Sequence, residues 1–318
     1  MVTIFALAAA LLYGSADFLG GVATRRARAL AILPASTLAG LAVVLVAALA
    51  AGEAVSRTGL AWGVAAGAVG GIGLIVFYAG LAEGPMTIVA PTSALTATVL
   101  PVAVSIADGE RATASVYAGA LICLAAVVLV STAGSPAAAA GADDGTGAAG
   151  ATGDGVTARG AHVARPHAPS LVHRLATRGF HARAIGYGLA AGATFGLFFI
   201  FLRNAGRSGA LWPIVASRLT GFLIVVIAAA SWRVRPVIVA GGARLLMAVF
   251  GSGILDASAN VSYVIATRLG LFGLAVVLTS LYPGVTVVLA RFVLGERLRV
   301  VQLAGLLLAA LGIILVTV

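Results

Sequence analysis

The sequence contains no lysine, a single cysteine and few charged residues of any kind. Charged side chains make up 9% of its 318 residues, and all twenty cations are arginines. A water-soluble domain needs far more polar side chains on its surface, so this scarcity excludes an ordinary soluble fold. The lone cysteine, Cys123, excludes a disulfide framework.

The sequence also lacks the signatures of catalysis. No GxSxG, HExxH, Walker-type or GxGxxG motif occurs in a strand–turn–helix context, and no nucleophile is paired with a base. The four histidines lie in or beside one polar stretch, and their spacing fits no standard metal motif. We therefore expect no enzyme, no catalytic residue, no bound metal and no cofactor.

Hydrophobic residues, by contrast, make up 61% of the chain and gather in long runs. A run of about 20 apolar residues crosses a hydrocarbon core about 30 Å thick. The sequence therefore predicts an all-α membrane protein with ten transmembrane helices. They are expected at residues 3–23, 30–50, 59–82, 86–107, 114–133, 184–203, 209–231, 243–266, 271–293 and 299–317.

The net charge of +10 does not indicate a nucleic-acid partner. The arginines lie mostly between the apolar runs, as helix-flanking anchors do, and not in a basic stripe with interleaved aromatic residues. Their exclusive use, with abundant Ala and Gly, is typical of GC-rich bacterial genes. We expect a multi-pass protein of a bacterial cell (inner) membrane, in contact with membrane lipid and without nucleic acid.

One stretch of the sequence occurs twice, 186 residues apart. Residues 84–132 and 270–318 each contain an apolar run, a Gly-Glu-Arg break and a second apolar run. The repeat divides the chain into two five-helix units, residues 3–133 and 184–318. An odd number of helices per unit turns the second unit upside down, the inverted repeat of many secondary transporters. Residues 134–183, rich in Ala, Gly, Asp and Pro, are predicted to form a flexible linker.

The Gly-Glu-Arg breaks carry a family resemblance. The second break reads LGERL at residues 294–298, followed by QLAG at 302–305, and the first reads DGERA at 108–112. With the paired repeat, these residues resemble the EamA-type, ten-helix branch of the drug/metabolite transporter superfamily. The resemblance covers residues 5–133 and 185–317. It implies a transporter of small solutes with both termini in the cytoplasm, and it does not identify the cargo.

The distribution of arginine implies the opposite orientation. Connections on the side of the linker hold twelve arginines, and those on the other side hold five. Because short cytoplasmic connections are enriched in arginine, this count places the linker in the cytoplasm. We favour the count, since it is a physical argument about this sequence.

Asp17 is an acidic residue inside the first predicted span. An ionisable side chain at membrane depth is costly and is therefore a functional candidate. Tyr13 lies one turn earlier on the same helix face. If Asp17 faces the bundle interior, its carboxyl group can exchange a proton for a cation or for a donor on the cargo. The alternative is an interfacial ion pair with Arg25 and Arg26.

Asp256 lies deeper, in the middle of the eighth span. At 100° per residue, Ser252, Asp256, Asn260 and Tyr263 fall within an arc of about 80° and form one polar stripe. The corresponding residues of the first unit are small or apolar, so the repeat does not require this stripe. It predicts a cavity lining, with hydrogen bonding between helices as the alternative.

Arg218 lies in the middle of the seventh span, too far from either end to reach the interface. It needs a partner, which Asp256, Asp17 or an anionic cargo group would supply. Further candidates are hydroxyls near in-span prolines, for which a bond to their own helix backbone is the alternative. These are Thr92, Thr96, Ser280 and Tyr282. The predicted substrate-binding residues are Tyr13, Asp17, Arg218, Ser252, Asp256, Asn260, Tyr263 and Tyr282.

Together these features predict a secondary transporter that moves a small metabolite or drug-like solute by alternating access. Protons are the candidate coupling ion. A lipid-linked carrier flippase and a non-transporting membrane sensor or scaffold remain as alternatives. The carboxylates of the Gly-Glu-Arg breaks, Glu110 and Glu296, are predicted to serve as turn and capping residues.

Overall fold

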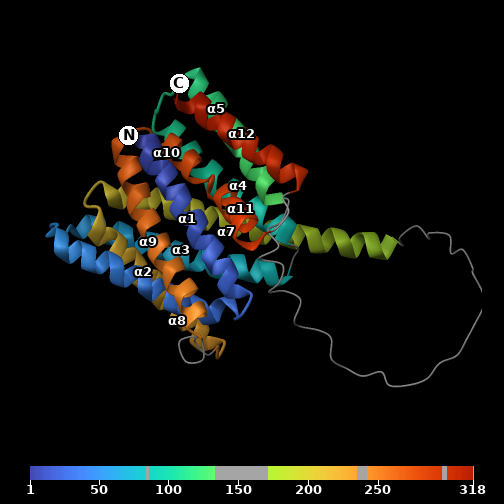
Figure 1. Ribbon diagram of the computed structural model, residues 1–318, viewed down its shortest axis with the longest axis horizontal. Helices are drawn as coiled ribbons and strands as arrows, with labels where there is room; N and C mark the ends of the chain where they lie inside the picture. The colour runs from blue at the N-terminus through green and yellow to red at the C-terminus, as the bar shows by residue number, and fades with distance from the viewer. Residues whose placement is uncertain (84–85, 133–170, 235–241, 296–298, 318) are drawn as a thin grey trace, which may run out of the picture.

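The computed structural model describes residues 1–83, 86–132, 171–234, 242–295 and 299–317 (Figure 1). Within these ranges all regular structure is helical. To the first unit we assign α1 (Val2–Thr24), α2 (Ala29–Ala51), α3 (Arg57–Glu83), α4 (Met86–Ala107) and α5 (Ala114–Thr132). To the second we assign α7 (Leu171–Gly206), α8 (Leu211–Ser231), α9 (Ala243–Leu269), α10 (Phe272–Thr279), α11 (Tyr282–Leu294) and α12 (Val300–Thr317).

The helices have the length and composition of membrane spans. Eight spans among the described residues are long and apolar enough to cross a bilayer, and two shorter apolar helices lie at 114–130 and 300–316. One of the eight, Phe272–Leu294, consists of α10 and α11 in succession. The prediction of an all-α membrane protein with ten spanning segments is therefore confirmed.

The ninth span is broken, whereas the sequence predicted one continuous helix over 271–293. α10 ends at Thr279 and α11 begins at Tyr282. Pro283 occupies the first turn of α11, where its missing N–H group leaves no intrahelical bond unmade. Prolines inside α4 do not have this effect, because that helix continues past both Pro91 and Pro101.

Helix α7 is longer than the predicted sixth span. It begins at Leu171, inside the stretch assigned to the linker, and its first part projects beyond the bundle (Figure 1). Residues 171–183 contain no proline and are rich in Leu, Ala and Arg, which favour helix. The helix therefore extends upstream of residue 184. The predicted linker residues 134–170 lie outside the described residues.

The two units pack against each other as an inverted repeat requires. α1 lies along α9, and its counterpart α7 lies along α3. α2 contacts both α8 and α9, just as α8 contacts both α2 and α3. The pairs that the repeat maps onto themselves, α2 with α8 and α5 with α12, are also in contact, and the second pair lies at the periphery (Figure 1). The ten spans therefore form one interleaved bundle.

Glycines set the closest approaches between the units. A Cβ atom on Gly67 of α3 would clash with the carbonyl oxygen of Ser217 on α8. The residue 186 positions later, Gly253 of α9, meets the carbonyl oxygen of Ser36 on α2 in the same way. Small residues at such crossings let helix backbones touch, which is how helices associate in lipid. The repeat thus preserves two glycine contacts across the interface.

Both termini lie at one end of the bundle, which we call the terminal face (Figure 1). The connection between α4 and α5 crosses this face to the other unit. Glu110 accepts hydrogen bonds from the backbone N–H groups of Phe272 (3.0 Å) and Gly273 (3.1 Å) at the start of α10. Its carboxylate also meets the Ser105 hydroxyl and Arg203 Nη2, the latter at 3.4 Å. Glu110 is therefore a capping residue, as predicted, for a helix of the second unit.

Within the second Gly-Glu-Arg break, residues 295–297, the structure describes the glycine alone. Its carboxylate, that of Glu296, lies outside the described residues, so its predicted capping role stays a prediction. The glycine of the break, Gly295, is described and ends α11 in the left-handed conformation, with φ of 69°. Gly109 of the first break also has a positive φ, 83°. Both breaks therefore begin with a backbone conformation that favours glycine.

Glu53 makes a second cap across the terminal face. Its carboxylate accepts the N–H groups of Ala210 (2.6 Å) and Leu211 (2.7 Å), where α8 begins. Its carbonyl oxygen accepts the indole N–H of Trp212 at 2.9 Å. Partial burial opposes ionisation, but these N–H donors and the charge of Arg268 outweigh it and lower the pKa of Glu53 below 4.5. Both caps thus join a connection of the first unit to a helix start of the second.

The glycine contacts make a first prediction. Gly253→Ala should destabilise the protein by about 3 kcal/mol, because a Cβ at that site cannot coexist with the Ser36 carbonyl oxygen. Gly186→Ala is the matched control, since nothing lies within 4 Å of a Cβ placed there. Thermal unfolding in detergent measures both. Equal melting temperatures for the two variants would contradict the packing.

The Glu53 cap makes a pH-dependent prediction. Glu53→Gln should lower the free energy of unfolding by about 1 kcal/mol at neutral pH, which is the contribution of a typical N-cap. Because the folded-state pKa of Glu53 lies below 4.5, the wild-type advantage is complete above that pH and is lost as the pH falls through the folded value. Melting temperatures of both proteins between about pH 3 and about pH 8 test this. A difference in melting temperature between the two proteins that stays constant across the acid range would refute this prediction.

Candidate functional site

An ion pair between α8 and α9 forms the centre of the candidate site. Arg218 Nη1 donates to the Oδ2 atom of Asp256. The Arg218 side chain is 10% exposed and that of Asp256 is 39% exposed. A guanidinium at mid-membrane needs a counter-charge, and the structure supplies Asp256, one of the three partners expected from the sequence.

The second nitrogen of the same guanidinium has no partner. Arg218 Nη2 is buried, and no hydrogen-bond acceptor lies within reach of it among the described residues. An unmade hydrogen bond from a buried charged group costs about 1–3 kcal/mol or more. This nitrogen is therefore a donor without a partner in this conformation.

Tyr13 ties this pair to the first unit. Its hydroxyl donates to Asn260 Oδ1 at 2.5 Å, and the Asn260 amide donates to the backbone oxygen of Asp256 at 3.1 Å. The side chains of Tyr13 and Asn260 are both buried. The predicted stripe of α9 thus faces α1, and one of its polar groups bonds across the interface between the units.

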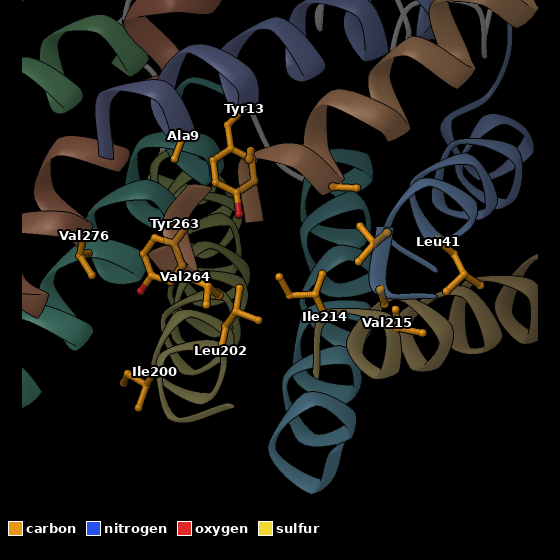
Figure 2. Packing of buried hydrophobic residues seen from close by; sticks show 14 of the residues in the cluster. Ala9, Tyr13, Leu41, Ile200, Leu202, Ile214, Val215, Tyr263, Val264 and Val276 are labelled. Carbon is orange, nitrogen blue, oxygen red and sulfur yellow. The ribbon is translucent and has the colours of Figure 1, made fainter. Parts of the chain in front are cut away.

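Aromatic rings surround this hydrogen bond. The ring of Tyr13 lies 6.2 Å from those of Phe199 and Tyr282, and Phe199 lies 4.9 Å from Tyr263. Figure 2 shows Tyr13 and Tyr263 next to each other at one end of the buried cluster, with Ile214 further along. The rings come from α1, α7, α9 and α11, so both units contribute to this aromatic wall.

Tyr263 differs from the other predicted residues of the stripe. It is completely buried, and its hydroxyl donates to the Phe199 carbonyl oxygen at 3.1 Å. Its polar atom is therefore already satisfied by the backbone of α7. Tyr263 is therefore the buried member of the aromatic wall, and its ring packs against Phe199.

Asp17 faces the interior of the bundle. It lies within electrostatic reach of Asp256, Tyr78 and Tyr282, which belong to α9, α3 and α11. Its side chain is nevertheless exposed. No hydrogen bond or ion pair joins it to another described residue. The alternative of an ion pair with the two arginines at the end of α1 is therefore not observed.

The remaining candidates separate into two groups. Ser252 lies where α9 meets α1, with its Oγ 3.3 Å from a Cβ placed on Gly20, one turn from the ion pair. The hydroxyls of Thr92, Thr96 and Ser280 donate to carbonyl oxygens of their own helices at 2.7, 2.9 and 2.8 Å. The back-bonding alternative thus holds for these three hydroxyls.

Tyr78 is a candidate that the sequence did not single out. It lies on α3, close enough to Asp17 for their charges to interact. The available signal was its neighbour Phe77, which corresponds to Tyr263 in the repeat and contacts the Phe195 ring at 6.1 Å. Tyr78, next to that position, adds α3 to the helices that surround the candidate site.

A separate cavity of about 310 Å³ lies at the terminal face. Its lining comprises Glu110, Arg203, Arg207, Thr267, Arg268 and Gly270. Arg203 is engaged by Asp108 (2.6 Å) and lies over the Phe272 ring at 4.2 Å, whereas Arg207 is exposed. This cavity is polar and lies beside the Glu110 cap, away from the predicted site residues.

The central ion pair makes a prediction about stability. Asp256→Asn should destabilise the protein by about 3 kcal/mol, because it leaves the Arg218 charge buried without a counter-charge. The double variant Arg218→Gln with Asp256→Asn removes both charges and should recover most of that loss. Chemical unfolding in detergent gives the double-mutant cycle. Additive losses would show that the two side chains do not depend on each other.

Comparisons with known proteins agree with this architecture. One crystal structure superposes on 99% of this chain and 96% of its own length, with a TM-score of 0.71 and 19% sequence identity. At that identity the likeness establishes the fold alone. No curated protein matches the sequence. Residues 182–318 match the EamA-like transporter family. The matched residues contain the second five-helix unit, so this half of the chain is similar to the EamA-like transporter family.

Proposed function

We propose that this membrane protein is a secondary transporter that moves a small solute by alternating access. The observation that carries the proposal is the position of Arg218, Asp256 and Asp17 inside the bundle, where α1 of one unit meets α8 and α9 of the other. Charges at membrane depth are costly and mark solute or ion pathways. A scaffold has no use for an unpaired carboxylate at this interface.

The terminal face supplies one of the two gates that alternating access requires. The Glu110 and Glu53 caps bridge the units there, and Arg203 adds an ion pair to Asp108. We call these contacts the terminal clamp. A solute cannot pass this end until those bonds open. Under the proposal, rocking of one unit against the other breaks them and exposes the site to the terminal face.

Asp17 is the proposed proton site. It has no cationic partner among the described residues and is exposed to the inside of the bundle. A carboxyl group in that position can bind a proton or a cationic solute in turn, which would couple their movements. Proton coupling predicts that Asp17→Asn abolishes solute-driven pH changes in proteoliposomes, while Glu83→Gln at the exposed end of α3 leaves them intact.

A lipid-linked carrier flippase is the second candidate function. The cavity at the terminal face favours it, since three arginines at the end of a membrane bundle are suited to a phosphate group. A fluorescent lipid phosphate in the same proteoliposomes separates the two functions. Translocation of the lipid without solute flux supports the flippase.

Alternating access is testable without knowing the cargo. In a Cys123→Ala background, Ser252→Cys places a reporter beside the site, and a membrane-impermeant maleimide labels it from either side. Weakening the terminal clamp with Glu110→Gln should raise labelling from the terminal face about tenfold, the equivalent of one hydrogen bond of about 1.4 kcal/mol. Ser115→Ala is the control, since the Ser115 hydroxyl at the start of α5 bonds Thr113 and, among the described residues, none of the second unit.

Two results of this experiment would contradict the proposal. If Glu110→Gln leaves labelling from both sides unchanged while the protein stays folded, Glu110 is not part of a gate. If the wild-type reporter is labelled from each side at the full rate of a freely accessible thiol, both gates are open together, the bundle is a channel and the transporter proposal fails.

A further inference from the structure

The site contains two charged groups of opposite sign, each with bonding capacity left over. Arg218 is nine-tenths buried, and its Nη2 atom lacks an acceptor among the described residues. Asp17 has neither a hydrogen bond nor an ion pair to any described residue. A site that offers one free donor and one free carboxylate is complementary to a solute with an acceptor and a cationic group.

The surroundings of Asp17 favour a cation over a neutral donor. The charged group within its reach is a second carboxylate, that of Asp256. Three tyrosines also lie close enough to interact with it, namely Tyr13, Tyr78 and Tyr282. Carboxylates and aromatic faces both attract an ammonium group. With the guanidinium counted against the two carboxylates, the formal charge of the site is one negative unit, which a monocation neutralises.

The surroundings of Arg218 define the second feature of the solute. Nη1 is held by Asp256 and Nη2 is buried without a partner, so an acceptor that reaches Nη2 when the bundle opens does not displace the ion pair. A neutral carbonyl or hydroxyl oxygen satisfies this donor without adding negative charge. A carboxylate also satisfies it, but the complex would then retain the site's own negative charge, at a cost inside the membrane.

The third feature is the body of the solute. The rings of Tyr13, Phe199 and Tyr282 form a wall between the α1 and α11 sides of the site. Aromatic rings stack with flat apolar groups at centroid separations of about 4.5–7 Å. A ring on the solute would therefore gain more from this wall than an aliphatic chain.

We propose that the cargo is an aromatic monocation whose ammonium group binds Asp17 and whose neutral oxygen acceptor binds Arg218 Nη2. This inference rests on the proposed transport function and adds the chemical class of the solute. Asp256 then acts as a positioning residue, which holds the guanidinium so that one nitrogen remains free. The corresponding amino acid, which carries a free carboxylate, should bind less tightly than this solute.

Four matched probes test the proposal on the purified full-length chain. Phenylalaninamide carries the ammonium and the neutral oxygen, phenethylamine lacks the oxygen, hydrocinnamamide lacks the ammonium, and phenylalanine adds the carboxylate charge. Phenylalaninamide should bind at least about tenfold more tightly than each of the others, which is the worth of one charge-assisted hydrogen bond. Ligand-induced thermal shifts, titrated for each probe, give the affinities.

Two substitutions assign the contacts. Asp17→Asn should weaken phenylalaninamide and phenethylamine together, since both use the ammonium contact. Arg218→Lys keeps a cation beside Asp256 but removes the second guanidinium nitrogen. The affinity for phenylalaninamide should therefore fall to the affinity for phenethylamine. Phenethylamine, which does not use that nitrogen, should lose less affinity than phenylalaninamide in Arg218→Lys. Glu83→Gln, at the exposed end of α3, is the charge control and should change neither affinity.

The outcomes separate the two proposals. Equal binding of phenethylamine and phenylalaninamide to the wild type would overturn the acceptor contact, and tightest binding of phenylalanine would overturn the monocation. If no probe binds but another solute crosses proteoliposomes, the cargo class is wrong and the transport function stands. If phenylalaninamide binds as expected but never crosses, the transport function is wrong and the recognition chemistry stands.

Discussion

The arrangement of the bundle depends on one constraint: the positive charge of Arg218 must be compensated at membrane depth. A guanidinium that is nine-tenths buried in a span cannot shed its proton and has no water shell. Asp256 compensates it from α9, which fixes the rotation of α8 relative to α9. The same turn of α9 then presents Asn260 to Tyr13 of α1, so one ion pair orients three helices from both units.

The inverted repeat explains the scaffold but not the chemistry. The glycine contact of Gly67 in the first unit has its counterpart in that of Gly253 in the second, so both halves of the interface follow one rule. The position that corresponds to Asp256 is Gly70, where a Cβ atom would lie 2.9 Å from the Phe198 ring. A ring of α7 thus packs beside Gly70, at the place that corresponds to Asp256, and the Arg218–Asp256 ion pair has no charged counterpart on the other side of the pseudo-twofold axis.

The membrane spans could be predicted from the sequence because their length and composition are set by the bilayer itself. The need of Arg218 for a counter-charge was also predictable, and Asp256 was one of the expected partners, but the sequence did not decide between it, Asp17 and the cargo. The hydrogen-bond partner of the Tyr263 hydroxyl could not be predicted, because it depends on which carbonyl group of α7 lies opposite.

The break in the ninth span could not be located from proline alone, because Pro101 lies in a continuous helix. Tertiary contacts account for that difference: Thr279 at the end of α10 and Thr286 in α11 approach carbonyl oxygens of α1 at 3.5 and 3.0 Å. α1 therefore follows the ninth span on both sides of its break, and a periodicity along one helix contains no information about this neighbour.

The candidate site and the terminal clamp are joined through α7 and α9. Tyr263 of α9 bonds the Phe199 carbonyl oxygen of α7, and Arg268 Nε bonds that of Gly206 at 2.5 Å, so the two helices are fastened at two levels. Arg203 lies between those levels and reaches the first unit. If α7 and α9 move as one body, a shift of α1 at the site displaces the clamp as well. Transport by alternating access needs such a connection, because a solute must not find both ends open.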